Sequence, residues 1–260
     1  MLSEHTVAEA AKAAGLTAPS RFIAVTGSTN TDVWRLAEQG APEWTVVVAG
    51  RQTAGRGRLG RTWVTPAGAV LHVSLLLRPR LAPEGAPLLS LSAAVAAAEA
   101  CRTAATIDVR CKWPNDLIVG LRKLGGILTE ASVQGDRVEF VVVGTGVNVG
   151  QAAEDFPLEL RDRATSVARE GGRAEPERLL ESYLTRLREL YEGHQEGIGA
   201  RVLDPYRRLC ATIGRTIRAS TVDGSIVEGK ATAVGDGGEL IVETPQGPRS
   251  VEFGEIAHLD

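Results

Sequence analysis

The sequence predicts an α+β fold, with a mixed β-sheet and flanking helices over residues 1–212 and a small β-barrel over residues 213–260. Three observations support this division. Helical and strand-like hydrophobic patterns alternate through the first part of the chain. After residue 212 the pattern changes to short strands separated by glycine-containing turns. Hydrophobic residues make up 43% of the chain and aromatic residues only 4%, so we expect an aliphatic core.

The first half of the larger domain is expected to contain helices at 1–16 and 31–39, the second of which ends at a glycine. Apolar runs predict strands at 44–49 and 70–77. The Ala- and Leu-rich stretch 87–105 has helical spacing, so it predicts a long helix that covers the sheet.

The second half is expected to complete the sheet. Strands are predicted at 107–112 and 117–119, and residues 124–129 lead into a hairpin whose return strand is 138–147. Directly after Pro176, leucines and tyrosines recur at the spacing typical of an amphipathic helix that packs on a sheet. The barrel strands are predicted at 216–220, 226–234, 239–244 and 249–253.

Composition and charge exclude several classes of protein. A formal net charge of -3 argues against a globally basic nucleic-acid-binding surface, although it leaves room for a local cationic patch. The three cysteines are too widely spaced for a disulfide framework or a zinc ribbon. The N-terminal residues lack a signal-peptide pattern, and no run reaches the roughly 18 apolar residues of a membrane span. We therefore expect a cytoplasmic protein with no membrane partner.

Residues 55–60, Gly-Arg-Gly-Arg-Leu-Gly, fit the dinucleotide-binding fingerprint literally but not in context. The following residues 61–66 cannot open a helix, and Arg78 and Arg80 stand where that fingerprint places an acidic residue. Three arginines interleaved with glycines instead offer N–H groups and guanidinium groups that suit an anionic ligand. The alternative is a solvated basic loop.

Three further blocks combine cations, amides and glycines beside predicted strands. Residues 112–116 read Lys-Trp-Pro-Asn-Asp, residues 123–127 place a lysine before a glycine pair, and residues 144–150 contain three glycines and an asparagine. Glycines inside strands commonly mark the close approach of a ligand or another backbone. We therefore expect one end of the sheet to gather glycine-rich backbone, lysines and amides.

Five blocks in register resemble the biotin protein ligases. They are residues 28–30, Gln52 with 55–63, 112–116, 123–127 and 144–148. The match spans residues 22 to 150, and the C-terminal strands are also similar to that family. The resemblance implies a catalytic domain like that of class II aminoacyl-tRNA synthetases, an SH3-like barrel, and a short form without an N-terminal DNA-binding domain.

The resemblance also implies an activity. Such ligases activate biotin as biotinyl-5'-AMP with ATP and Mg2+, then transfer biotin to a lysine of the biotin carboxyl carrier domain of acyl-CoA carboxylases. Biotin binding is implied for Ser28, Thr29, Asn30, Gln52, Gly55, Arg56, Gly57, Lys123, Gly144 and Gly146. ATP or adenylate binding is implied for Arg58, Arg61, Trp63, Lys112, Asn115 and Asn148. The resemblance assigns no side chain to the metal.

Catalytic roles are expected for Lys123, Arg58 and Asp116. Joining a carboxylate to a phosphate needs fixed cations more than a general base, so Lys123 is expected to act as a positive clamp. Asp116 either orients or deprotonates the incoming lysine or caps the turn at Pro114, and both interpretations stay open. We also hypothesise that residues 53–62 are disordered without ligand and close over the adenylate.

Two other functions fit the sequence less well. A lipoate protein ligase performs similar carboxylate activation, but Gln52 with Ser28 and Thr29 suits the cyclic urea of biotin better than a dithiolane. A nucleic-acid-binding regulator is disfavoured because about twenty residues before Phe22 are too few for a three-helix DNA-reading domain. No DNA partner is expected.

Overall fold

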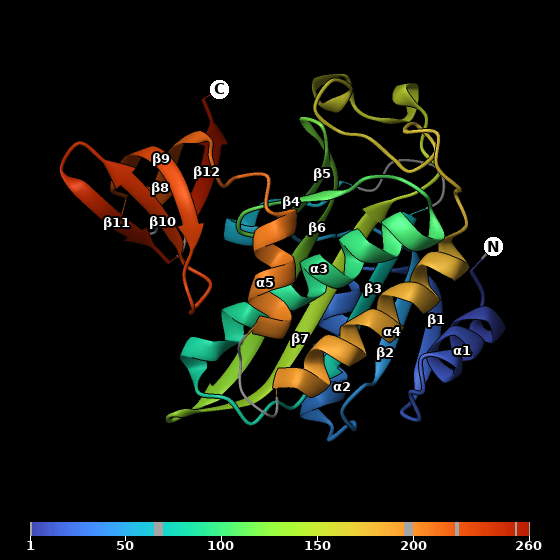
Figure 1. Cartoon of the computed structure of the whole chain (residues 1–260). Helices are drawn as coiled ribbons and strands as arrows, with labels where there is room; N and C mark the ends of the chain where they lie inside the picture. Colours follow the sequence, from blue (N-terminus) through green and yellow to red (C-terminus); the bar gives the residue numbers. More distant parts are fainter. Residues whose placement is uncertain (1, 65–69, 195–199, 222–223, 253, 260) are drawn as a thin grey trace.

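The computed structural model describes residues 2–64, 70–194, 200–221, 224–252 and 254–259. Its strands form two sheets, one in the order β1-β2-β3-β7-β6-β5-β4 and a second in the order β11-β10-β9-β8-β12. In the first sheet β1 is parallel to β2 and the other neighbouring strands are antiparallel. Figure 1 shows the second sheet at one end of the molecule, beside β4 and α5. The predicted α+β class with a mixed sheet is confirmed.

The first sheet consists of β1 Ser20–Thr26, β2 Val46–Gln52, β3 Val70–Leu77, β4 Arg110–Lys112, β5 Asp116–Val119, β6 Arg122–Gln134 and β7 Arg137–Asn148. The described helices are α1 Glu4–Ala13, α2 Thr29–Glu38, α3 Ala86–Ala104, α4 Pro176–His194 and α5 Ala200–Leu209. The second sheet consists of β8 Thr216–Thr221, β9 Ile226–Val234, β10 Leu240–Thr244, β11 Gly247–Val251 and β12 Gly254–His258. Short 3-10 turns lie at η1 Arg58–Gly60, η2 Pro83–Gly85, η3 Ala153–Asp155 and η4 Leu158–Leu160.

Helices cover both faces of the first sheet. Figure 1 shows α3 and α4 in front of the sheet and α2 behind it. Because side chains alternate along a strand, the apolar residues of β3 and β7 divide between the two faces. Val73, Leu75 and Val143 belong to the large core, whereas Leu76 and Val142 pack in a smaller cluster with residues of α2. The face that carries α2 is the one that holds the candidate site.

The second sheet is held against the first domain by specific contacts. Trp113 is buried, and its Nε1 donates to the carbonyl of Gly238 at 2.9 Å. Arg207 of α5 donates to the carbonyl of Val234 at 2.8 Å. The strand order leaves β11 and β12 as edges, so no hydrogen bonds between described strands close the expected SH3-like barrel. The boundary at residue 212 stays a prediction.

Most predicted elements are confirmed, and three elements were not predicted. Helices α1 to α4, the β6–β7 hairpin and β8 to β10 lie within a few residues of their expected positions. Strand β1, helix α5 and strand β12 were not expected, and part of the strand expected at 249–253 falls on Phe253, outside the described residues. Helix α5 carries Pro205 in its interior, which obscures its helical pattern.

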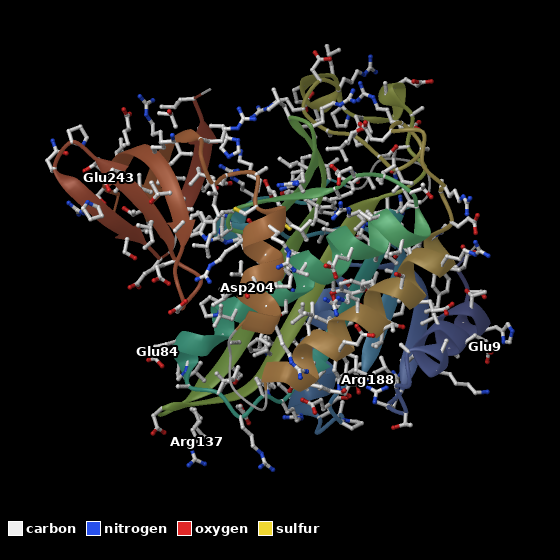
Figure 2. The ribbon with its side chains drawn as sticks, viewed as in Figure 1. Glu9, Glu84, Arg137, Arg188, Asp204 and Glu243 are labelled. Atoms are coloured by element: carbon white, nitrogen blue, oxygen red, sulfur yellow. The ribbon has the colours of Figure 1, made fainter. Side chains whose placement is uncertain are left out.

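Charged side chains are spread around the surface. In Figure 2, Glu84, Arg137 and Glu243 point outward from the periphery of the molecule, and all three are exposed. No helix in the described part of the chain is long and apolar enough to cross a membrane.

Candidate active site

A strip of glycine backbone lies at the centre of the α2-facing side of the sheet. Gly146 of β7 pairs with Gly126 of β6 and with His72 of β3, and Gly144 pairs with Ser74. A Cβ at Gly144 would come within 2.0 Å of Asn30 Oδ1, and one at Gly146 would meet the Trp63 ring at 3.1 Å. Gly144 has no room for a side chain because Asn30 of α2 lies directly on it, whereas at Gly146 the Trp63 ring would have to shift slightly. We call Gly126, Gly144 and Gly146 the glycine floor.

The first turn of α2 and the end of β2 form one wall beside this floor. Gln52 Oε1 accepts from Thr29 N at 2.8 Å and from Thr29 Oγ1 at 3.0 Å. Ser74 Oγ lies 2.7 Å from Thr29 Oγ1 and 2.6 Å from Asn30 Oδ1. Ser28 is the buried N-cap residue, and its side chain makes no capping bond to the helix. These four residues from the predicted biotin set therefore lie together, with Thr29, Asn30 and Gln52 in one hydrogen-bond network.

The glycine-arginine loop, residues 55–63, folds back on itself over the floor. Gly57 N donates to Arg61 O at 2.7 Å, and Trp63 N donates to Gly55 O at 2.9 Å. Leu59 has a positive φ of 53°, which lets the chain turn tightly at the tip. Beneath the loop is a cavity of about 380 Å³ whose other walls include Leu128 and Glu130.

The three loop arginines have different partners. Arg56 Nη2 lies 2.7 Å from Glu130 Oε2 on β6. Arg58 Nη1 donates to Asn115 Oδ1 at 3.5 Å and to Gly254 O at 3.4 Å, while Arg61 pairs with Glu255. Burial lowers the pKa of Arg58, and the negative charges of Asp116 and Glu255 oppose this shift. Two of the arginines expected to bind nucleotide thus reach strand β12 of the second sheet.

Lys123 lies at the edge of the glycine floor. Its Nζ is 2.5 Å from Asp116 Oδ1 and 5.7 Å from the centre of the Trp63 ring, a cation-π geometry. A Cβ at Gly126 would be 3.5 Å from Nζ, so the amine is held directly above that glycine. The structure therefore brings the predicted clamp and the predicted carboxylate into contact.

The turn between β4 and β5 positions the remaining cations and amides. Lys112 stands opposite Asp116 in the antiparallel register. Burial lowers the pKa of Lys112; the charge of Asp116 opposes this shift, and Lys123 and Arg163 add to it. Asn115 Nδ2 donates to Ile127 O at 2.7 Å, which fixes the turn to β6.

Asn148 ends β7 and is buried. Its Nδ2 donates to Thr165 O at 3.0 Å, and Thr165 N in turn donates to Lys123 O at 2.8 Å. Asn148 therefore holds the chain segment that runs beside Lys123. Its proposed contact with the adenylate remains a prediction.

Several residues at this site were not predicted from the sequence, among them His72, Ser74, Glu130, Arg163 and Glu255. The two polar residues of β3 alternate within the otherwise apolar run 70–77, and that alternation was a usable signal for a polar patch on one face. Burial lowers the pKa of His72 to about 4, although a hydrogen bond with the Ala49 backbone raises it in part. The imidazole is therefore neutral near pH 7. Glu255 could not be found, because its partner Arg61 is 194 positions away.

Comparisons with known proteins show which family this chain resembles. The profile of the Biotin/lipoate A/B protein ligase family matches residues 22–148, and that of the Biotin protein ligase C terminal domain matches residues 212–259. The bifunctional ligase/repressor BirA of Bacillus spizizenii is 36% identical over 233 residues, covering 89% of this chain and 71% of that protein. The biotin--[acetyl-CoA-carboxylase] ligase of Mycobacterium tuberculosis is 34% identical over 91% of this chain and 88% of its own length.

The chain belongs to the biotin protein ligase family. Among solved structures, the Aquifex aeolicus biotin protein ligase in complex with biotin and ATP is similar, with a TM-score of 0.78 and 27% sequence identity. The alignment covers 92% of this chain and 97% of the Aquifex aeolicus chain. The fold and the enzyme class that the sequence resemblance implied are confirmed.

Proposed function

We propose that this protein is an ATP-dependent biotin ligase that forms biotinyl-5'-AMP and then transfers biotin to a lysine of a biotin carboxyl carrier domain. One observation carries the proposal: Lys123, the hydrogen-bonded Gln52–Thr29 wall and the arginine loop surround a single glycine floor. Relatives named biotin ligases match most of the chain, and a similar solved structure is a biotin protein ligase in complex with biotin and ATP. A cytoplasmic location is part of the same proposal.

The bicyclic head of biotin would lie on the glycine floor. Without side chains at Gly144 and Gly146, a flat ligand can approach the backbone closely. Oε1 of Gln52 already accepts hydrogen bonds from the backbone N and the hydroxyl of Thr29. The amide nitrogen of Gln52 would therefore donate to the ureido carbonyl. The hydroxyl of Ser28, which does not cap α2, is a further donor to the ureido group.

Adenylation needs opposing negative charges to be held together. The ionised biotin carboxylate attacks the α-phosphorus of ATP, a new C–O–P bond forms, and pyrophosphate leaves with the electrons of the broken P–O bond. Lys123 would hold the carboxylate, and Arg58 with Arg61 would stabilise the phosphate charge after Arg61 exchanges Glu255 for the nucleotide. The nucleophile is already an anion, so no general base is required.

Magnesium fits this site through the nucleotide rather than through a protein cage. Among the described residues no group of three or more His, Cys, Asp and Glu could hold a metal ion. The acids at the site, Asp116, Glu130 and Glu255, are each paired with a cation of the chain. Mg2+ commonly keeps several waters and binds through substrate phosphates, where it neutralises charge.

In the transfer step the carrier lysine loses one proton to solvent before it attacks the acyl carbon and a second one as the amide forms. The new C–N bond replaces the acyl C–O bond, and AMP leaves. We propose that Asp116 orients that amine, since its carboxylate already binds an ammonium group, Nζ of Lys123. The turn at Pro114 is held instead by Asn115 and by Trp113, whose backbone N donates to Thr212 Oγ1 at 3.0 Å.

The test is isotope exchange between pyrophosphate and ATP. With purified protein and Mg2+, exchange should require biotin and should not be supported by lipoate. The comparisons favour biotin over lipoate, because the matching relatives and the C-terminal profile are those of biotin ligases. Exchange supported by lipoate alone would overturn the substrate assignment.

A further inference from the structure

Glu130 joins two parts of the site that are far apart in the sequence. It lies on the α2-facing side of β6, where its Oε2 accepts from Arg56 Nη2 at 2.7 Å and from Asn30 Nδ2 at 2.8 Å. It also lines the cavity beneath the glycine-arginine loop. A single carboxylate oxygen therefore links the first turn of α2 to the loop.

The Asn30 side of this link is rigid. Asn30 is buried, and its Nδ2 also donates to Leu128 O at 3.1 Å while its Oδ1 faces Ser74 Oγ at 2.6 Å. The Gly144 backbone lies so close to the Asn30 side-chain amide that a Cβ at Gly144 would collide with it. Glu130 is thus held by a partner that cannot move far, and two donors stabilise its negative charge.

The Arg56 side of the link belongs to the base of the loop. Arg56 forms an antiparallel backbone bridge with Thr62, so fixing the Arg56 side chain also restrains the loop segment paired with it. Arg58 and Arg61 extend instead toward β12. The loop is therefore attached at two places, one on the catalytic sheet and one on the second sheet.

We propose that Glu130 is a positioning residue for this ligase. Through its ion pair with Arg56 it holds the loop over the glycine floor, so that the loop backbone retains biotin and the adenylate. The inference rests on the proposed biotin ligase function. Glu130 itself touches none of the reacting atoms, and the Arg56 guanidinium serves as an anchor rather than a phosphate ligand.

The experiment compares Glu130→Gln, Arg56→Gln and the double variant in biotin-dependent pyrophosphate exchange and in the release of preformed biotinyl-AMP. Each single change should raise the KM for biotin and the adenylate release rate about threefold to tenfold, with kcat for exchange changed less than about twofold. The double variant should add little beyond either single change, because both remove the same contact.

Glu228→Gln is the matched control. It breaks the ion pair between Arg218 and Glu228 on the second sheet, whose side chains are 54% and 48% exposed, and it should leave the KM for biotin unchanged. Unaltered KM and release in Glu130→Gln, or fully additive effects in the double variant, would overturn the inference while the proposed function stands. If Glu130→Gln does not fold, Arg56→Gln alone decides, since an unchanged KM there has the same meaning. Absence of exchange in the unaltered protein would remove the proposed function and this inference together.

Discussion

At the scale of single residues, the chemistry depends on a few charged pairs placed around uncharged backbone. Lys123 meets Asp116, Arg56 meets Glu130 and Arg61 meets Glu255, so three cations at the site each have a protein carboxylate as their partner. The sequence motifs identified all three cations but only one of the three acids. An acid inside a strand or near the C-terminus carries no local pattern that reveals its partner.

Lys123→Ala should abolish most of the adenylation activity. Without Nζ, the carboxylate and phosphate approach each other with less compensating charge, and the rate of biotin-dependent pyrophosphate exchange should fall by about a hundredfold or more. Single-turnover formation of biotinyl-AMP measures this directly. Lys230→Ala, an exposed lysine on β9, is the control and should retain normal exchange. A Lys123→Ala rate within a factor of two of the unaltered protein would contradict the role of Lys123 as clamp.

His72 should make the stability of the protein depend on pH. Its pKa is about 4 in the folded chain and 6.5 in the reference state, so the unfolded chain binds more protons between those values. Stability from this group is therefore present above pH 6.5 and is lost as the pH falls toward 4. Between pH 7.5 and pH 5 the loss should be about 2 kcal/mol. Urea unfolding of the unaltered protein and of His72→Gln at both pH values measures this loss. An equal pH dependence of the unfolding free energy in the two proteins would refute the role of His72.

At the scale of elements, the site depends on how closely α2 and the loop approach the sheet. Hydrophobic periodicity predicted α2, β3, α3 and the β6–β7 hairpin because each has a regular pattern of its own. The packing of Asn30 on Gly144 was not predictable from that pattern, since it arises from the crossing of two separate elements. Strand β1 was missed because its residues are mostly half-buried or exposed and show little alternation.

Gly144→Ala should therefore disturb both stability and biotin binding. The added methyl group would overlap Asn30, so α2 must shift, at a cost of about 1 to 3 kcal/mol in the free energy of unfolding. Chemical denaturation and the Kd for biotin measure the two effects. Gly27→Ala is the control for stability, because a Cβ at Gly27 meets nothing within 4 Å. Equal unfolding free energies for the two variants would contradict the close packing at Gly144.

At the scale of the whole molecule, the second sheet is part of the site as well as a separate structural unit. Glu255 and the Gly254 carbonyl of β12 bind two arginines of the catalytic loop, and Trp113 anchors the β4–β5 turn to Gly238. Short strands and glycine turns in the sequence predicted the second sheet. These contacts were not predictable, because nothing in the local sequence specifies how two domains meet.

Trp113→Phe tests the contact between the two sheets. It keeps most of the buried ring but removes the Nε1 donor and leaves Gly238 O without that partner, which should lower the unfolding free energy by about 1 to 3 kcal/mol. Thermal denaturation gives the change in Tm. Since Trp113 is expected to touch neither substrate, the KM for biotin should rise much less than in Gly144→Ala. A Tm equal to that of the unaltered protein would contradict the structural role of this hydrogen bond.

The most direct test of the whole account is to look for the activated intermediate itself. Purified protein incubated with biotin, ATP and Mg2+ should yield biotinyl-5'-AMP by mass spectrometry, and addition of a biotin carboxyl carrier domain should consume it with the biotin mass appearing on one lysine. Failure to detect the mixed anhydride or pyrophosphate under these conditions would contradict the assignment.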